Sequence, residues 1–234
     1  MIAPYIQDAL QQKATDIYIE KNRIFFRQND RLIETKHQAA GIGILPDYCE
    51  KKSPTHIRVL PENISATSLN YPPETQKILA HRKGLIFLMG SKRSGKTTLL
   101  LHLLSRLAPS RINVANTHLD ENSPFRQIEQ HIYCDSLSDP DVSILSITTP
   151  KDAFYALQQA ANHLVIAEMN ALNIPDGFEQ LMVLLSQYPA QNILNLLSMH
   201  SKCIVSIALV RTVNEEKKPL IAIAQRNESL SAQL

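Results

Sequence analysis

A short stretch of the sequence combines glycine, lysine and threonine at the spacing of a phosphate-binding loop. The run GSKRSGKT, residues 90–97, fits the pattern GxxxxGK[ST] at every defined position and holds two of the six glycines of the chain. In such a loop, backbone amides at the start of a helix face phosphate oxygens, and the lysine ammonium adds positive charge near the β- and γ-phosphates. The pattern therefore predicts a nucleotide-binding loop.

The loop residues have separate expected roles. Thr97 offers its hydroxyl to Mg²⁺. Lys92 and Arg93 are long cations that either attract a triphosphate or point to solvent, and the sequence leaves both open. A glycine-bearing turn before a core helix is the simpler alternative for the whole run. The residues expected to hold the nucleotide are Gly90, Ser91, Lys92, Arg93, Ser94, Gly95, Lys96, Thr97 and Thr98.

Composition places few limits on function. The chain has 234 residues, of which 44% are apolar, enough to bury a core in one large or two small domains. Lys and Arg number 24 against 22 Asp and Glu, so the net charge of +2 gives no general reason to expect nucleic acid or direct membrane insertion. The 3 cysteines have no paired spacing, and no apolar run could span a bilayer. We therefore expect a cytoplasmic protein with reduced thiols.

The first part of the chain reads as a small α+β unit. Residues 3–14 predict a helix, and the strand-like runs 16–20 and 23–28 are joined by a turn at Lys21 and Asn22. Another strand is expected at 56–60. A proline-rich connection follows, and we place the domain boundary near residue 70, giving domains 1–70 and 71–234.

Beyond residue 70, helices and strands alternate. This pattern, with fully apolar strands, predicts a parallel sheet covered on both faces. Thr149, Pro150 and Asp152 form a helix start signal before the helix at 150–162. Helices are expected at 73–82, 96–107, 150–162, 176–187 and 190–210, and strands at 85–89, 112–116, 164–168 and 219–224.

Several segments resemble the type II/type IV secretion ATPases, the family that includes the pilus retraction motor. KATDIYIE and RIFFRQNDRLIE resemble the opening of the family, and IRVLPENISATSLNYPPETQKILAHRKGLIFLMGS resembles its linker into the nucleotide-binding core. The resemblance resumes at HLVIAEMNA and at PAQNILNLLSMHSKCIVSIALVRTV, so it covers most of the chain discontinuously. LVRTVNEEKKPL is similar to the branch found in type IVB secretion and conjugation.

Family membership implies an architecture and a set of partners. The implied fold is a RecA-like P-loop core, shortened here, after a PAS-like α+β domain, with ATP and Mg²⁺ between the two. The implied assembly is a homo-oligomer, a hexamer, or an association with a related motor ATPase. ATP hydrolysis would drive domain motion acting on an inner-membrane platform protein of a pilus, secretion or conjugation machine. The protein would then be cytoplasmic, or peripheral at the inner membrane through that partner.

The resemblance also implies catalytic positions. Glu168, after the strand LVIA, fits the Walker B glutamate, which holds the Mg²⁺ shell or orients the attacking water. The family has Gly before this residue and Arg-Asp after it, whereas this chain has Ala167, Asn170 and Ala171. The alternative is a solvated glutamate at a strand end.

The family's acidic box falls on Asn116 and Thr117, which are not carboxylates. Asp120 or Glu121 would substitute if the following loop folds back. His200 invites assignment to the family's histidine box, but its surroundings match a later helix, so we interpret it as a histidine on a helix face. On this interpretation the histidine-box block is deleted between Glu168 and Pro189.

The arginines that reach a neighbouring subunit's phosphates in the family are scarce here. Gln158 and Gln159 occupy the helix that normally carries them, which should slow hydrolysis. Arg58 remains a candidate for such a contact and Arg27 for one from the N-terminal domain, and a surface arginine is the alternative for each.

Two functional hypotheses remain open. The chain is either an ATP-driven motor subunit or a nucleotide-binding assembly or regulatory subunit that hydrolyses ATP weakly or not at all. A small P-loop kinase is disfavoured because no arginine-rich lid segment is present.

Overall fold

The computed structural model describes residues 3–28, 31–38, 49–53, 55–59, 71, 74–115, 128, 131–134, 139–211 and 217–225. These residues form two compact units, which we treat separately. The first holds the described residues before position 68, and the second holds those after it apart from Ile128. The predicted boundary near residue 70 falls between described segments and stays a prediction.

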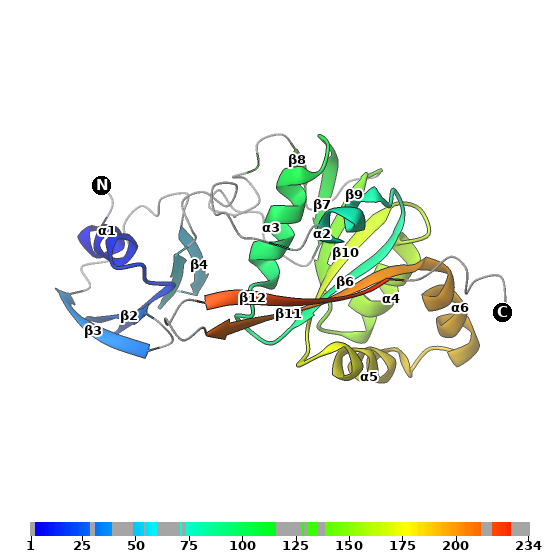
Figure 1. The fold of residues 1–234 in the computed structure, drawn as a ribbon. Helices are drawn as coiled ribbons and strands as arrows, with labels where there is room; N and C mark the ends of the chain where they lie inside the picture. The colour runs from blue at the N-terminus through cyan, green and yellow to red at the C-terminus, as the bar shows by residue number, and fades with distance from the viewer. Residues whose placement is uncertain are drawn as a thin grey trace. The chain divides into compact units, whose positions relative to one another are not determined.

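The first unit is a five-stranded antiparallel sheet with one helix, as expected for a small α+β unit (Figure 1). The predicted hairpin is confirmed, because β1 pairs with β2 through a turn at Lys21 and Asn22, both in left-handed backbone. The strand order is β3-β2-β1-β5-β4. The elements are α1 (Pro4–Gln11), β1 (Asp16–Glu20), β2 (Arg23–Gln28), β3 (Arg31–Gln38), β4 (Cys49–Ser53) and β5 (His56–Val59).

The second unit is built on a seven-stranded, largely parallel sheet in the order β12-β11-β6-β10-β9-β7-β8. Its strands are β6 (Gly84–Gly90), β7 (Arg111–Ala115), β8 (Ile132–Cys134), β9 (Val142–Ser146), β10 (Leu164–Asn170), β11 (Ser201–Arg211) and β12 (Lys217–Gln225). Its helices are α2 (Glu74–Lys77), the short 3-10 helix η1 (Ile78–Ala80), α3 (Lys96–Arg106), α4 (Pro150–Gln159), α5 (Ile174–Leu185) and α6 (Ala190–His200).

Strand β6 lies inside this sheet, between β11 and β10, and every residue in it is buried. It runs parallel to β10 on one edge and to β11 on the other. Leu85, Phe87 and Met89 pack in one apolar cluster with side chains of α4, α5 and α6. Figure 1 shows α3 on one side of the sheet and these three helices on the other. The predicted parallel sheet with both faces covered is therefore confirmed.

One predicted helix is wrong. The run 190–210 was expected to be helical throughout, but α6 ends at His200 and β11 begins at Ser201. The strand segment has the period of a half-buried strand, because Cys203, Val205 and Ile207 are buried while the residues between them are less so. Strands β3, β4, β8 and β9 were not anticipated either.

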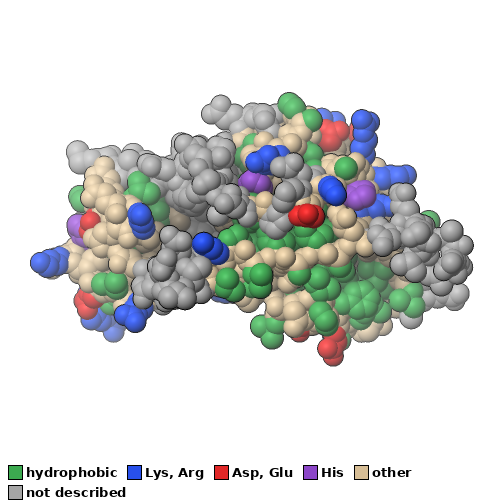
Figure 2. Space-filling view, viewed as in Figure 1, with side chains coloured by type: hydrophobic (Ala, Val, Ile, Leu, Met, Phe, Trp, Pro, Cys, Tyr) green, Lys and Arg blue, Asp and Glu red, His purple; other side chains and the backbone are tan. Residues whose placement is uncertain are grey.

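Hydrophobic side chains reach the surface over β11, β12 and α5 in the view of Figure 2. The exposed large hydrophobic residues of these elements include Leu209, Val210 and Leu220 on the two strands and Phe178 and Val183 on α5. Antiparallel pairing joins β11 to β12 from Cys203 to Arg211. The two strands therefore form one continuous ribbon at the edge of the sheet.

The helix start signal before α4 is confirmed. The Thr149 hydroxyl accepts a hydrogen bond from the Asp152 backbone N–H (3.3 Å), and Asp152 Oδ2 accepts one from the Thr149 N–H (2.8 Å). This reciprocal arrangement satisfies amides that the first helical turn leaves unpaired. The helix therefore begins at Pro150, where the sequence placed it.

Replacing His163, which precedes β10, should reduce the acid sensitivity of the second unit. Its Nε2 lies 2.7 Å from the Ser143 hydroxyl of β9. Burial lowers the pKa of His163 from its usual 6.5, although the Asp139 and Asp141 carboxylates act in the opposite direction. The unfolded state therefore takes up this proton first, so stability is complete above pH 6.5 and is lost as the pH falls below it.

We expect His163→Gln to flatten the loss of unfolding free energy between about pH 7 and pH 5.5, measured by urea denaturation at each pH. The half-exposed His81 provides the control substitution, His81→Gln. An unchanged pH slope in His163→Gln would contradict the assignment.

Candidate functional site: the loop between β6 and α3

The phosphate-loop motif lies where the sequence predicted it, between a buried strand and a helix. Gly90 ends β6, and Lys96 begins α3 after the intervening turn. Because the strand is parallel to its neighbours, the loop emerges at the carboxyl edge of the sheet. Ligands of open α/β sheets characteristically bind at this edge.

Two glycines of the loop are required by its geometry. A side chain at Gly90 would collide with the Ser94 hydroxyl and with the backbone carbonyl oxygen of Ile207 in β11. Gly95 has a φ of 94°, in the left-handed region that favours glycine, and it stands directly before α3. The loop is therefore pressed closely against β11.

Lys96 is largely buried, with 9% of its surface exposed. Its ammonium donates hydrogen bonds to the carbonyl oxygens of Gly90 and Ser91, each at 2.8 Å, and to Oδ1 of Asn170 at 3.0 Å. A buried ammonium needs such acceptors because losing water is costly. The Lys96 ammonium is thus held beside the loop, where a phosphate oxygen would compete with these three acceptors.

Asn170 is a site residue that the sequence analysis did not assign. It is the last residue of β10 and lies in register with Gly90, and the next backbone N–H, of Ala171, donates to the Gly90 carbonyl (3.1 Å). In the sequence it appeared only as a departure from the family pattern. Its place at the end of an apolar strand, level with a phosphate loop, was the available signal.

Glu168 lies deeper in the sheet than the sequence predicted. The strand expected to end at this residue continues to Asn170, and Glu168 is in register with Leu88 rather than Gly90. Two residues along a strand correspond to about 6.6 Å. The Oε1 atom of Glu168 is buried. The backbone position that carries this carboxylate therefore lies two residues before the level of the loop.

Strand β9 supplies a further carboxyl end, on the far side of β10 from β6. Ser146 ends β9 and pairs with Glu168, and Ile147 and Thr148 follow. None of these β9 residues carries a carboxylate, and the run was not recognised as a strand. Its apolar core between Asp-Pro-Asp and Thr-Thr-Pro was the signal that could have identified it.

The remaining predicted residues are distributed unevenly. Thr97 and Thr98 are half-buried in the first turn of α3, Lys92 is exposed, and Arg93 is half-buried with a left-handed φ of 67°. Asn116, Thr117, Asp120 and Glu121 lie outside the described residues, as does the side chain of Arg58. Their proposed roles remain predictions.

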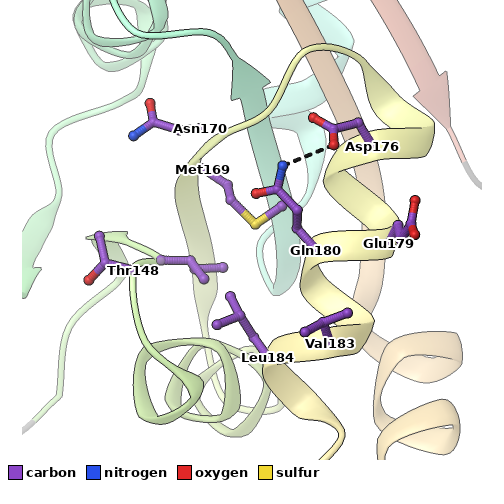
Figure 3. Close-up of a pocket in the computed structure, with 9 residues that line it drawn as sticks. Thr148, Met169, Asn170, Asp176, Glu179, Gln180, Val183 and Leu184 are labelled. Carbon is purple, nitrogen blue, oxygen red and sulfur yellow. Dashed lines mark hydrogen bonds between the residues drawn. The ribbon is translucent and has the colours of Figure 1, made fainter.

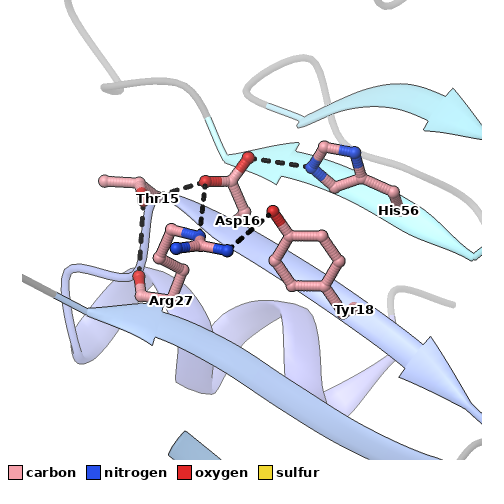
Figure 4. Close-up of polar contacts among 5 residues, drawn as sticks. All are labelled: Thr15, Asp16, Tyr18, Arg27 and His56. Atoms are coloured by element: carbon pink, nitrogen blue, oxygen red, sulfur yellow. Dashed lines mark hydrogen bonds and ion pairs between the residues drawn. The ribbon is translucent and has the colours of Figure 1, made fainter. Parts of the chain in front are cut away.

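Arg27 is held within the first unit by a polar cluster (Figure 4). Its Nε lies 3.8 Å from Oδ2 of the buried Asp16, and its Nη2 donates to the Tyr18 hydroxyl at 3.4 Å. His56 Nε2 lies 2.8 Å from Asp16 Oδ1, and its ring stacks on Tyr18 with centroids 4.5 Å apart. These contacts orient the guanidinium, and its contact with a neighbouring subunit stays a prediction.

A pocket of about 610 Å³ lies beside the carboxyl ends of β9 and β10 and along α5 (Figure 3). Asn170 both lines this pocket and accepts from Lys96, so the pocket adjoins the loop. The lining side chains are Ile147, Thr148, Met169, Asn170, Asp176, Glu179, Gln180, Val183 and Leu184.

The Asp176 carboxylate in this pocket is engaged by the start of α5. It accepts hydrogen bonds from the Leu172 backbone N–H at 2.6 Å and from Gln180 Nε2 at 3.0 Å, and both lower its pKa. Asn173 caps the same helix by accepting from the Asp176 N–H (2.9 Å). Asp176 therefore has a structural role at this helix end.

His200 is the last residue of α6, in agreement with its interpretation as a helix histidine. Burial lowers its pKa first, and the positive charges of Lys202 and Lys83 lower it further. Gln158 and Gln159 lie in α4 as expected.

Within the described segments, no group of three or more His, Cys, Asp or Glu side chains could hold a metal ion. None of the helices in the part of the chain described here is long and apolar enough to cross a membrane. Burial raises the pKa of the Cys49 and Cys203 thiols to about 12, which makes them poor nucleophiles.

Gly90→Ala should disrupt the loop. The added methyl group would overlap the Ile207 carbonyl oxygen, so we expect a loss of about 1–3 kcal/mol in unfolding free energy and a loss of nucleotide binding. Chemical denaturation and a binding titration would measure the two effects. Ser91→Ala, at the exposed neighbouring position, is the control and should stay within about 0.5 kcal/mol of the wild type. Equal stability of the two variants would contradict the close approach.

Comparison with known proteins gives similar structures but no similar sequences. No family model and no curated protein matches the chain. The ATPase DotB of Legionella pneumophila has a TM-score of 0.75 at 15% identity, covering 97% of this chain and 81% of that one. The pilus retraction motor PilT, solved with bound ADP, has a TM-score of 0.70 at 14% identity, with coverage of 97% and 84%.

DotB of Yersinia pseudotuberculosis has a TM-score of 0.66 at 12% identity, covering 98% of this chain and 80% of that one. Likeness at such low identity is evidence about architecture. The chain therefore has the expected fold, a RecA-like α/β core with a largely parallel sheet, preceded by a small α+β unit that contains an antiparallel sheet.

Proposed function

We propose that this chain is an ATP-binding subunit of a type IV pilus, secretion or conjugation apparatus. The observation that carries the proposal is the Lys96 ammonium, held at the carboxyl edge of the sheet within a complete GxxxxGK[ST] loop. The likeness of the fold to DotB and to the pilus retraction motor PilT supports the choice of machine. The solved PilT structure holds ADP, which supports a nucleotide as ligand.

The residues of the loop fit a triphosphate with Mg²⁺. The backbone at Gly90 has no room for a side chain, and Gly95 allows the turn that brings free amides to the start of α3. Lys96 would exchange its acceptors for phosphate oxygens, and Thr97 would offer its hydroxyl to Mg²⁺. When bound, Mg²⁺ supplies charge neutralisation between the phosphates.

Coupling of ATP to motion in an oligomeric ring is the motor version of this proposal. It includes assembly as a hexamer, or with a related motor ATPase, and action on an inner-membrane platform protein from the cytoplasmic side. Glu168 would orient the attacking water or hold the Mg²⁺ shell, with Asp120 or Glu121 as further carboxylates. For Glu168, this role requires the carboxylate to advance from the level of Leu88 toward that of Gly90.

A second version is an assembly or regulatory subunit that binds ATP and hydrolyses it weakly or not at all. The recessed position of Glu168 favours it, because general-base catalysis needs a carboxylate within hydrogen-bonding reach of the water. The β10 residue level with Gly90 is Asn170, whose amide cannot take up a proton as a carboxylate does. The two versions share the binding site and differ in turnover.

ATP binding should depend on Lys96. We expect Lys96→Ala to weaken Mg²⁺–ATP binding more than about tenfold, because it removes a charge-assisted contact to phosphate. Isothermal titration calorimetry on the full chain would measure it. The exposed Lys77 of α2 provides the control, Lys77→Ala, expected to stay within about threefold. Failure of the wild type to bind ATP would reject both versions.

Turnover separates the two versions. Steady-state phosphate release by the assembled, ATP-bound oligomer is measured for the wild type, Lys96→Ala and Glu168→Gln. The motor version expects release in the wild type that falls more than about tenfold in both variants. Release by the wild type no higher than that of Lys96→Ala rejects the motor version and supports the non-hydrolysing one.

A further inference from the structure

Strands β11 and β12 continue past the phosphate loop. The pairing of β11 with β6 ends at Ser206 and Met89, whereas its pairing with β12 continues to Arg211 and Lys217. The segment from Ile207 to Arg211 and its partners therefore form a two-stranded extension, which we call the β-arm. At the usual rise per residue, the β-arm is about 16 Å long.

One face of the β-arm borders the loop. A Cβ built on Gly95 would lie 3.6 Å from Cδ1 of Ile207 and 3.8 Å from Cδ2 of Leu209. Gly95 immediately precedes Lys96, whose backbone and ammonium belong to the expected phosphate site. The β-arm therefore begins where the phosphates would be bound and extends away from them.

The loop-facing side of the β-arm is apolar and partly open. Leu209 is 39% exposed and pairs with the half-buried Pro219, while Ile207 pairs with Ile221. Residues directly opposite on antiparallel strands share a face, so these four side chains lie on one aliphatic face. Ile207 is buried beneath it, and the partly exposed Leu209, Pro219 and Ile221 form an open aliphatic platform. Val210 and Leu220 alternate with them and lie on the other face of the β-arm.

We propose that this platform is the purine subsite of the nucleotide whose phosphates the loop binds. A nucleotide anchored at Gly95 and Lys96 must place its nucleoside beside the loop, and Leu209 is the partly exposed apolar side chain in contact distance of that glycine. Small-molecule sites are lined mainly by apolar groups, with a few polar ones to orient the ligand. A flat purine ring covers aliphatic side chains well, whereas a bare phosphate chain gains nothing from them.

The chemistry of the platform predicts which ligands gain affinity from it. The three platform side chains carry no hydrogen-bonding group, so they contact the face of the base and not its exocyclic edge. Adenine and guanine nucleotides should therefore gain similar affinity from the platform. Inorganic tripolyphosphate, which has the phosphates but no base, should gain none.

The inference rests on the proposed function, and its test compares ligands with and without a base. Binding of Mg²⁺–ATP and of inorganic tripolyphosphate to the full chain is measured by calorimetry for the wild type and Leu209→Ser. We expect Leu209→Ser to weaken ATP binding about fivefold to tenfold, because it removes a buried aliphatic contact, and to leave tripolyphosphate binding within about twofold.

The neighbouring Val210→Ser is the matched control, because Val210 is 42% exposed on the opposite face of the same strand. We expect it to bind both ligands as the wild type does. Leu209→Met keeps an aliphatic contact and should retain ATP binding, so the test stands even if Leu209→Ser folds poorly.

Each of the other possible results of this experiment rejects a specific part of the proposal. Equal binding of ATP and tripolyphosphate by the wild type, or equal ATP affinity in Leu209→Ser and Val210→Ser, rejects the purine subsite and leaves the phosphate site intact. Parallel weakening of both ligands in Leu209→Ser assigns Leu209 to the shape of the loop instead. Loss of self-association in Leu209→Ser, with ATP affinity unchanged, assigns the platform to a second copy of the chain. Failure of the wild type to bind either ligand rejects the proposed function itself.

Discussion

Burial of β6 on both faces and pairing along both of its edges is the constraint on which the second unit depends. Each residue of this strand is buried, and parallel neighbours satisfy its backbone on either side. A strand in this position requires apolar residues on both faces, which is why GLIFLM contains no charge. The loop that follows Gly90 is consequently held at a defined level against β10 and β11.

The position of Gly90 along the sheet determines which side chains of β10 and β11 lie beside the loop. The register of β10 brings Asn170 to Gly90 and leaves Glu168 beside Leu88. Because successive side chains of a strand point to opposite faces, Glu168 and Asn170 share the face on which Lys96 contacts Asn170. A one-residue change in register would turn both away. The register between β10 and β6 therefore places a hydrogen-bond acceptor beside Lys96 and keeps Glu168 at the level of Leu88.

The residues proposed to bind the nucleotide and those proposed to hydrolyse it differ for a physical reason. Phosphate binding uses backbone amides, two glycines and one lysine, all within a short contiguous run. Hydrolysis needs a carboxylate delivered from another strand to the same level as the phosphates. On the other edge of β6, Ile207 and Leu209 of β11 border the loop, because a Cβ built on Gly95 would touch both. Of the two proposed activities, the described residues supply more of the groups needed for nucleotide binding than of those needed for hydrolysis.

Sequence patterns predicted those elements whose signal is local. The hairpin at Lys21 and Asn22, the capped start of α4 and the loop before α3 each have their determinants within a few residues. The prediction failed at β11, because α6 passes into it at His200 and Ser201 without a glycine or proline between them. Apolar residues continue across that junction, so a single long helix was expected.

The GxxxxGK[ST] run and the apolar residues before it were enough to predict a loop between a buried strand and a helix, because glycine backbone freedom and apolar runs are properties of neighbouring residues. What surrounds the loop depends instead on the tertiary structure. Lys96 and Asn170 are 74 positions apart, and Leu209 of β11 borders the space beside Gly95. Such contacts follow from strand order and register, which depend on the burial of the whole sheet rather than on any one segment.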